Sequence, residues 1–198
     1  MKKHQEVLNR QHYILDQFKV MPAAYYSYLD EIMQPKYFAE SEVLFRQGEI
    51  IDKAYFLSSG FMLANHYDEN GDKHVINIFA QDEIISGKSF TEHTPSDYEL
   101  VACKGAYVLY LTYDEVNTIY EKFPPTQEQA MIILADKEKK ALDRSRMLNQ
   151  VAEKKVADFY DRYPELKKQP GKIIIDADIA SYLMISESSL RAHRANYK

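Results

Sequence analysis

The sequence predicts an α+β fold, and three observations support this prediction. Apolar residues recur at helical spacing over about the first 33 residues and again after Tyr113, whereas short apolar runs separated by turn residues occupy the region between them. The composition fits a folded chain, because 45% of the residues are hydrophobic and 28% are charged. A chain of 198 residues can form one ordinary domain or two small ones.

The N-terminal segment, from about Gln5 to Met33, is predicted to be helical with an interruption near Pro22. Pro35 is expected to end this segment, because proline lacks the N–H group that a continuing helix uses. We assign residues 1–36 to an N-terminal helical lead. Its apolar positions at helical spacing are Leu8, Tyr13, Ile14, Phe18, Tyr25, Tyr28, Leu29 and Ile32.

Six short apolar runs between Tyr37 and about Thr112 predict β-strands. The strongest turn signal between them is Asn70-Gly71, since both residues tolerate the positive φ of a two-residue hairpin turn. Strands at this spacing predict an antiparallel sandwich or barrel over residues 37–122. The six runs are residues 43–45, 54–57, 61–64, 75–79, 100–102 and 107–111.

Helical spacing returns after the predicted strands. Residues 114–122 predict a short helix that two prolines end, and residues 126–149 predict a long helix within the segment 123–150. The apolar stripe of the long helix has two interpretations, which are core packing and a dimer seam. The stripe consists of Leu134, Ala141 and Leu148 at intervals of seven, with Met131, Ala135 and Leu142 beside them.

The last block, residues 151–198, ends in a pattern typical of a helix-turn-helix. Four elements are expected in it: a helix over 151–163 that Pro164 ends, a short strand over 172–175, and helices over 178–184 and 186–198. Ser186 is a good N-cap for the last helix. The residues expected to pack inside the helix pair are Ile179, Ala180, Leu183, Ile185 and Leu190.

A helix that carries polar and guanidinium groups on its outer face suits the major groove of DNA. The alternative is a small helical hairpin with a solvated basic face. If the pair binds DNA, Ser186 and Ser189 are expected to touch phosphates, and Arg191 and Arg194 bases or phosphates. The candidate DNA-binding residues are Ser186, Ser188, Ser189, Arg191, His193 and Arg194.

The charge distribution permits a DNA-contacting C-terminal block. The whole chain has a formal net charge of -5, but residues 151–198 carry 9 basic and 7 acidic residues, whereas the preceding 150 residues carry 16 and 23. No apolar run approaches the roughly 18 residues of a membrane span, and no secretory segment is evident, so we expect no membrane partner and a cytoplasmic location.

Several classes of site are excluded or unsupported by the sequence. A single cysteine, Cys103, excludes an internal disulfide and a cysteine-rich metal cluster. The six histidines show no close metal-ligand spacing, and we expect no metal and no cofactor. No nucleophile elbow, P-loop or dinucleotide fingerprint is present, so an enzyme is not expected.

The order of parts and several motifs resemble the Crp/Fnr family of bacterial transcription regulators, and the resemblance extends from about Met21 to Lys198. It implies an antiparallel β-roll (double-stranded β-helix, jelly-roll-like) effector domain, a homodimer along a long dimerisation helix, and palindromic double-stranded DNA read by C-terminal helix-turn-helix domains. The motifs that carry the resemblance are Ser41–Glu49, Ala54–Gly60, Asp68–Val75, Phe79–Ser86 and Asp178–Leu183.

The chain departs from this family where relatives hold a cyclic nucleotide. Those relatives use a glutamate on the ribose and, about ten residues later, an arginine on the phosphate. By alignment these positions fall on Ser86 and near Ser96-Asp97, and an acidic residue repels a phosphate. Lys88 supplies a cation but lacks the bidentate geometry of guanidinium. We therefore expect no response to cyclic nucleotides.

An unknown small-molecule effector stays possible. Its pocket is expected between residues 84–90, residues 96–98 and the start of the long helix. The candidate lining residues are Ile85, Ser86, Lys88, Ser89, Ser96 and Tyr98.

The helix-turn-helix also departs from the family. Relatives commonly have glycine at the corner, where Met184 stands here, and an arginine that reads guanine where Ala192 stands. The predicted function is a homodimeric DNA-binding transcriptional regulator. The alternative is a β-roll dimer that binds a small molecule or a protein partner and whose helix-turn-helix is degenerate.

Overall fold

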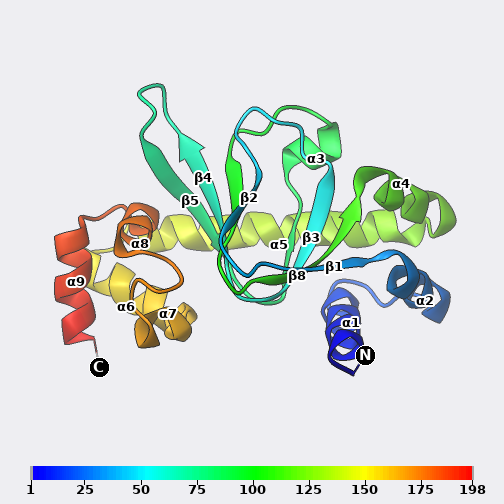
Figure 1. Ribbon diagram of the computed structural model, residues 1–198, viewed down its shortest axis with the longest axis horizontal. Coiled ribbons are helices and arrows are strands. Elements are labelled where there is room, and N and C mark those ends of the chain that lie inside the picture. The colour runs from blue at the N-terminus through cyan, green and yellow to red at the C-terminus, as the bar shows by residue number, and fades with distance from the viewer. Residues whose placement is uncertain (1, 198) are drawn as a thin grey trace.

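A computed structural model describes residues 2–197, excepting the side chains of Lys2 and Lys3. The molecule is built along one long helix, α5 (Pro125–Leu148). A β-roll covers the middle of this helix, the N-terminal helices lie near one end of it, and the C-terminal helices lie at the other end (Figure 1). No helix among residues 2–197 is both long enough and apolar enough to cross a membrane.

The N-terminal helices are α1 (Lys2–Asp16) and α2 (Ala23–Ile32). Pro22 precedes α2 in an extended conformation, which confirms the predicted interruption. Pro35 does not simply end the helical segment, because it lies inside an unpredicted strand, β1 (Gln34–Tyr37). The strand tolerates proline because β1 is at the edge of its sheet.

The β-roll consists of two four-stranded antiparallel sheets, with strand orders β1-β8-β3-β6 and β2-β7-β4-β5. The predicted antiparallel β-roll is therefore confirmed. The strands after β1 are β2 (Glu42–Phe45), β3 (Lys53–Ser59), β4 (Met62–Tyr67), β5 (Lys73–Phe79), β6 (Glu83–Ile85), β7 (Glu99–Ala102) and β8 (Tyr107–Thr112).

The predicted two-residue turn at Asn70-Gly71 is wrong, because a five-residue loop, 68–72, joins β4 to β5. The Asp68 carboxylate accepts hydrogen bonds from the backbone N–H groups of Asn70 (2.9 Å) and Asp72 (3.0 Å). Gly71 alone in the loop has a positive φ, of 85°. The Asp68 side chain thus organises a longer loop than the Asn70-Gly71 pair alone predicts.

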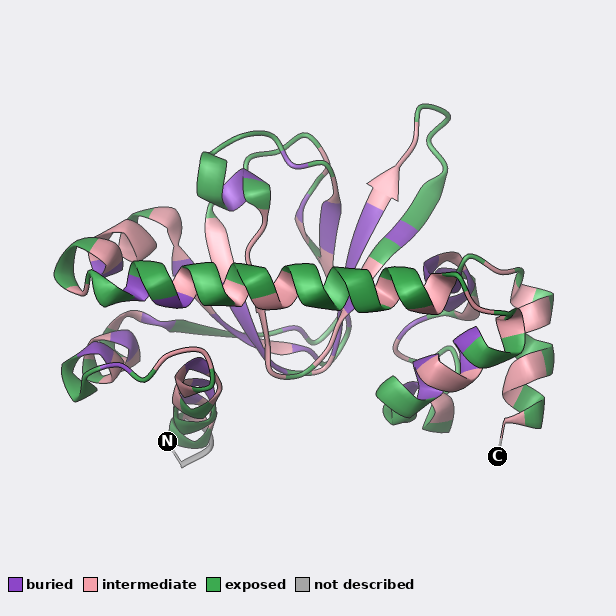
Figure 2. Ribbon diagram, turned by 180° about the vertical axis from the view of Figure 1, so that it is seen from behind, coloured by how far each residue is buried: buried purple, intermediate pink, exposed green. Residues whose placement is uncertain are grey.

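Strand β3 separates two cores because its side chains alternate between its faces. Tyr55 and Leu57 point into the roll and pack with residues of both sheets. Phe56 points outward and packs with α1, α2 and α4 (Tyr113–Lys122). A third core lies between the other sheet and the C-terminal helices, and Figure 2 shows the buried faces of the elements.

The C-terminal block contains four helices, α6 (Ala152–Arg162), α7 (Pro164–Lys168), α8 (Asp176–Leu183) and α9 (Glu187–Asn196). Pro164 ends α6 as predicted, but it also begins α7, since the first position of a helix needs no N–H donor. The predicted strand over 172–175 is wrong. This segment forms turns and bends, and its apolar character reflects burial of Ile174 in the C-terminal core.

The C-terminal helices pack directly on β5. The Ser181 hydroxyl accepts a hydrogen bond from the Val75 N–H (2.9 Å), and the Lys73 ammonium lies 2.5 Å from the Asp178 carboxylate. The Tyr163 hydroxyl donates to the Ile78 carbonyl (3.1 Å). The roll therefore contacts the helix pair as well as α5.

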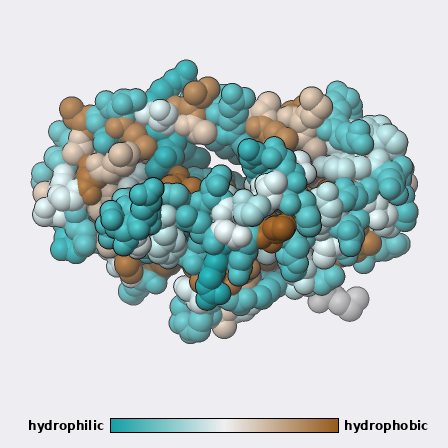
Figure 3. Space-filling view, turned by 90° about the horizontal axis from the view of Figure 1, so that it is seen from above, coloured by the Kyte–Doolittle hydropathy of each residue, from teal (hydrophilic) through white to brown (hydrophobic). Residues whose placement is uncertain are grey.

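One side of α5 is not covered by the rest of the chain. Met131, Leu134 and Leu142 are 70%, 45% and 54% exposed, so these three residues of the apolar stripe are not core residues within one chain. The uncovered side faces the viewer in Figure 2, and in Figure 3 hydrophobic atoms gather along the edge on which α5 lies.

Candidate functional site

Helices α8 and α9 form a compact pair whose corner is Met184. Its backbone is left-handed, with φ 53° and ψ 51°. This conformation lets the Ile185 N–H donate to the Ala180 carbonyl (3.1 Å), which closes α8. The residues predicted to pack inside the pair are buried or partly buried there: Ile179, Ala180, Leu183, Ile185 and Leu190.

The start of α9 is capped as predicted. The Ser186 Oγ accepts a hydrogen bond from the Ser189 N–H (3.2 Å) and lies 2.9 Å from the Ser188 Oγ. Ser188, Arg191 and Ala192 follow at helical spacing and are all exposed, so they form the outer face of α9. His193 is half-buried and lies beside this face.

Arg194 does not lie on the outer face, which corrects the prediction that it points outward. Its side chain is only 17% exposed, and its guanidinium donates to both carboxylate oxygens of Asp176 (2.6 and 2.9 Å) and to the Tyr160 hydroxyl (3.2 Å). These hydrogen bonds raise the pKa of Arg194 and lower the pKa of Asp176. Arg194 therefore fastens α9 to the start of α8 and to the last turn of α6.

Arg191 is the more available of the two arginines. Its side chain is 59% exposed, although it donates to Asp176 (3.1 Å) and to Glu187 (2.5 Å). The role of Asp176 was not predicted from the sequence. Asp176 opens α8, where an acidic residue also fits the helix dipole, so the residue type alone gave no sign of its arginine partners.

The six residues predicted for an effector pocket do not converge on one cavity. Ile85 is buried between the sheets, and Lys88 is an exposed residue of α3 (Lys88–Glu92) that pairs with Glu92 at 3.6 Å. The Ser89 Oγ accepts from the Ile51 N–H (3.1 Å) and donates to the Thr94 carbonyl. These two hydrogen bonds tie Ser89 of α3 to the loop before β3 and to the residues after α3.

Ser96 and Tyr98 lie in the segment between α3 and β7. The Ser96 Oγ donates to the Tyr98 carbonyl (2.8 Å), and Phe45 packs edge-on against the Tyr98 ring at 5.5 Å. A Cβ atom at Gly87 would lie 2.6 Å from the Tyr98 hydroxyl oxygen. Side chains thus fill this part of the roll, and burial raises the pKa of Tyr98 to about 12.

Ser86 is the one predicted effector residue that lines the two cavities beside α5. Its carbonyl and its hydroxyl each accept a hydrogen bond from the Lys137 ammonium at 2.8 Å. The smaller cavity, of about 280 Å³, lies between the roll, α5 and the C-terminal helices. Its charged lining residues are Lys137, Lys140, Arg144, Arg162, Asp82, Glu83 and Asp136.

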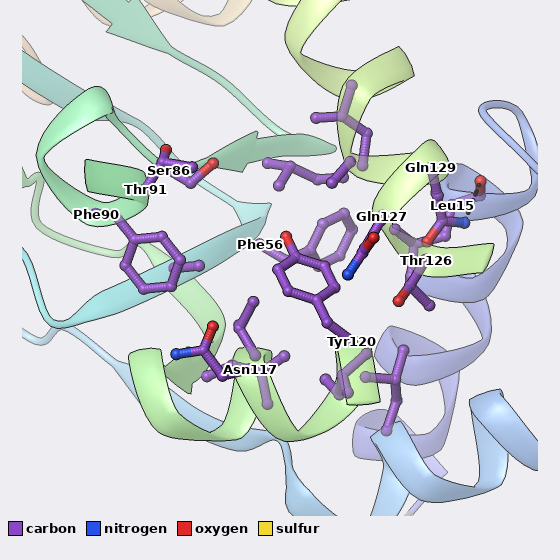
Figure 4. A pocket seen from close by; sticks show the side chains of 18 of the residues that line it. Leu15, Phe56, Ser86, Phe90, Thr91, Asn117, Tyr120, Thr126, Gln127 and Gln129 are labelled. Carbon is purple, nitrogen blue, oxygen red and sulfur yellow. Dashed lines mark hydrogen bonds between the residues drawn. The ribbon is translucent and has the colours of Figure 1, made fainter. Parts of the chain in front are cut away.

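The larger cavity, of about 380 Å³, lies toward the N-terminal helices (Figure 4). Residues from β3, β6, α3, α4 and the first half of α5 line it, together with residues of α1 and α2. Among the described residues no group of acidic, histidine or cysteine side chains is arranged to hold a metal ion. Cys103 is buried, and this burial raises the pKa of its thiol to about 12.

Residues 35–123 match the family model of the cyclic nucleotide-binding domain. This match agrees with the two-sheet roll and with the helix that follows it. Among curated proteins, no sequence matches the chain. Over residues 35–123 the chain is therefore similar to the cyclic nucleotide-binding domain, both by this family match and by its fold.

Solved structures with the same fold include bacterial regulators. FixK2 from Bradyrhizobium japonicum is 13% identical with a TM-score of 0.66, over 83% of this chain and 84% of that one. The catabolite activator protein of Thermus thermophilus is 16% identical with a TM-score of 0.55, over 90% and 84%. The c-di-GMP-responsive regulator CLP of Xanthomonas campestris is 11% identical with a TM-score of 0.62, over 88% and 91%.

Proposed function

We propose that this chain is a DNA-binding transcriptional regulator of the Crp/Fnr type, which acts as a homodimer and does not respond to cyclic nucleotides. The observation that carries the proposal is the capped, exposed helix α9, held by α8 at a left-handed corner and placed after a roll and a long helix. Structural neighbours with this fold over most of their length include bacterial regulators, which supports the same function.

Helix α9 has the properties of a recognition helix. Its first turn carries the exposed Ser188, and Ser188, Arg191 and Ala192 form one continuous outer face. An N-terminal turn that enters the major groove brings such a face to the base edges. Arg191 is the side chain on this face that can donate two hydrogen bonds to guanine, once it leaves Glu187 and Asp176.

Homodimerisation follows from the uncovered side of α5. Met131, Leu134, Ala141 and Ser145 are exposed and follow heptad-like spacings of three, seven and four residues. A second copy of α5 packed in parallel would cover this stripe. Because a two-fold axis then relates the two α9 helices, a palindromic operator is the matching DNA.

The side chains that pack inside the roll support insensitivity to cyclic nucleotides. The arginine that relatives place on the phosphate is absent, and Tyr98 and Phe45 pack into each other beside Gly87. Addition of cAMP is therefore expected to leave the thermal unfolding midpoint unchanged, since a ligand stabilises only a protein that binds it.

DNA binding can be tested by fluorescence anisotropy with a pool of palindromic duplexes at several salt concentrations, because affinity depends on salt. Some duplexes should bind about a thousandfold more tightly than the bulk. Arg191→Ala should weaken this specific binding by about tenfold or more. The matched control is Arg46→Ala, an exposed arginine directly after β2 in the roll, which should bind like the wild type.

Dimerisation has its own test by sedimentation velocity. Leu134→Glu places a charge on the uncovered stripe and should yield monomers, whereas Lys139→Glu, also exposed on α5 but beside the stripe, should stay dimeric. A wild-type chain that sediments as a monomer at all concentrations would contradict the dimer.

The second candidate function is a β-roll dimer with a degenerate helix-turn-helix. The observation that favours it is that Asp176 and Glu187 hold Arg191, while Asp176 also holds Arg194, so the carboxylates compete with DNA for both guanidinium groups. Weak binding that is equal for all duplexes at every salt concentration would support this candidate.

A further inference from the structure

The larger cavity beside α5 has a lining without charge. It is bounded by apolar side chains such as Phe56, Phe90 and Ile133, and none of its lining residues is acidic, basic or a histidine. Its volume of about 380 Å³ is within the range of small-molecule sites. A phosphate or carboxylate would have no cation to pair with inside it, so this lining favours a neutral molecule.

Polar groups at both ends of this cavity can orient such a molecule. Thr91, Asn117 and Gln127 line it from α3, α4 and α5, and Figure 4 shows Gln127 reaching in from α5 and Tyr120 from α4. Hydroxyl and amide groups can donate to or accept from a ligand. These groups can therefore fix the orientation of a ligand without adding a charge to the cavity.

The Gln11 side chain, from α1, gives independent evidence for a missing partner. Gln11 is 4% exposed and lines the cavity, and its Oε1 has no hydrogen-bond partner among the described residues. Its Nε2 contacts the Met33 sulfur at 2.8 Å. A buried acceptor without a donor is costly, and a ligand N–H or O–H would remove this cost.

The cavity is separate from the places where an anion would bind. The smaller cavity holds Lys137, Lys140, Arg144 and Arg162, while the loop around Ser96 lines neither cavity. The two cavities share only Ile84, Ser86 and Ile133. Their chemistry therefore selects different ligands.

We propose that the uncharged cavity between β3, α3, α4 and α5 binds a neutral, mainly apolar small molecule that donates one hydrogen bond to Gln11. Met131 and Leu134 both line this cavity and belong to the uncovered stripe of α5. A bound molecule would thus contact residues of the dimer seam. Binding of a molecule in the cavity does not depend on the proposed function, whereas the role of this cavity as an effector site rests on it.

The test uses N-phenyl-1-naphthylamine, a neutral apolar fluorophore with one N–H donor, titrated into the full chain without DNA. Its fluorescence should rise to saturation at one probe per chain. Ala130→Phe fills the cavity from α5 and should lower the affinity by about tenfold or more. Ala195→Phe adds the same ring at an exposed position of α9, outside the cavity and away from the apolar stripe of α5, and should bind as the wild type does.

A second variant tests the orienting group. Gln11→Leu removes the unpartnered acceptor, so it should lower the affinity for the probe by about fivefold. The midpoint of thermal unfolding should stay the same or rise. The anionic analogue 1-anilinonaphthalene-8-sulfonate should bind more weakly than the neutral probe. Unsaturable fluorescence, or equal affinities for Ala130→Phe and Ala195→Phe with both variants folded by circular dichroism, would overturn the site. Because no DNA is present, failure of DNA binding leaves this result intact.

Discussion

The Arg194 guanidinium and the Asp176 carboxylate form a two-pronged ion pair, with N–O distances of 2.6 and 2.9 Å, between the last helix and the helix before it. Both side chains are less than one-fifth exposed. An arginine in α9, the helix that we propose to bind DNA, thus serves the internal structure of the helix pair, and its neighbour Arg191 faces outward.

Separate replacement of Arg194 and Arg191 should show that Arg194 contributes mainly to stability, whereas Arg191 contributes little to it. Arg194→Ala leaves the partly buried Asp176 without its main partner and should lower the free energy of unfolding by about 1–3 kcal/mol. Arg191→Ala removes an exposed pair and should cost less than about 1 kcal/mol. Urea unfolding measures both values. Equal losses would mean that Arg194 is no more structural than Arg191.

The same ion pair predicts a loss of stability in acid. Hydrogen bonds from Arg194 and Arg191 hold the pKa of Asp176 below its usual value in the folded chain. The stabilisation is therefore fully present above about pH 4, the ordinary pKa of an aspartate, and is lost as the pH falls through the lowered folded-state pKa. The difference in unfolding free energy between wild type and Asp176→Asn should shrink between pH 5 and pH 2, to be followed by urea titrations. A constant difference would show that ionisation of Asp176 contributes nothing.

The corner residue Met184 predicts a stabilising substitution. Its φ of 53° strains a residue with a side chain, and 71% of its surface is exposed, so little burial is lost on truncation. Met184→Gly should raise the free energy of unfolding by about 0.5–1 kcal/mol. Met184→Ala, which keeps the Cβ strain, is the control and should not stabilise. Thermal unfolding distinguishes the two variants.

Lys137 predicts that alkaline pH stabilises the fold. Burial lowers the pKa of its ammonium to about 8, so the unfolded chain binds more protons than the folded chain above that pH. Stability should then rise on the order of 1 kcal/mol between pH 7 and 9.5. Lys137→Met should abolish this rise. The range ends below pH 10 because burial also raises the pKa values of Cys103 and Tyr98. Ionisation of these groups on unfolding opposes the gain, and that of the Cys103 thiol begins first.

The fold was largely predictable because its periodic signals are strong. Six of the eight described strands, both long helical regions and the Ser186 cap follow from spacing and residue type. Strand β1 was missed because Pro35 indicates an interruption, and β6 because three residues cannot show an alternating pattern. The sequence predicts a strand at 172–175, where the structure has turns, because a run of isoleucines is equally apolar in a strand and in a buried turn.

The candidate site was less predictable because its partners lie far apart in the sequence. The sequence places Arg194 on a basic helix, but only the packed helices bring Asp176 and Tyr160 to it. Likewise the uncharged cavity joins Gln11 from the first helix to residues of α5 more than a hundred positions later. Neither set of contacts produces a local pattern in the sequence.

The straight course of α5 has a mechanical consequence. Its 24 residues span about 36 Å, from the uncharged cavity at one end to the helix pair at the other. A rigid rod of that length, tilted by about 5° at the cavity, would displace its far end by about 3 Å, which is close to the rise of one base pair. If α9 binds an operator half-site as proposed, a small rearrangement around Met131 would be magnified into a change of register between the two.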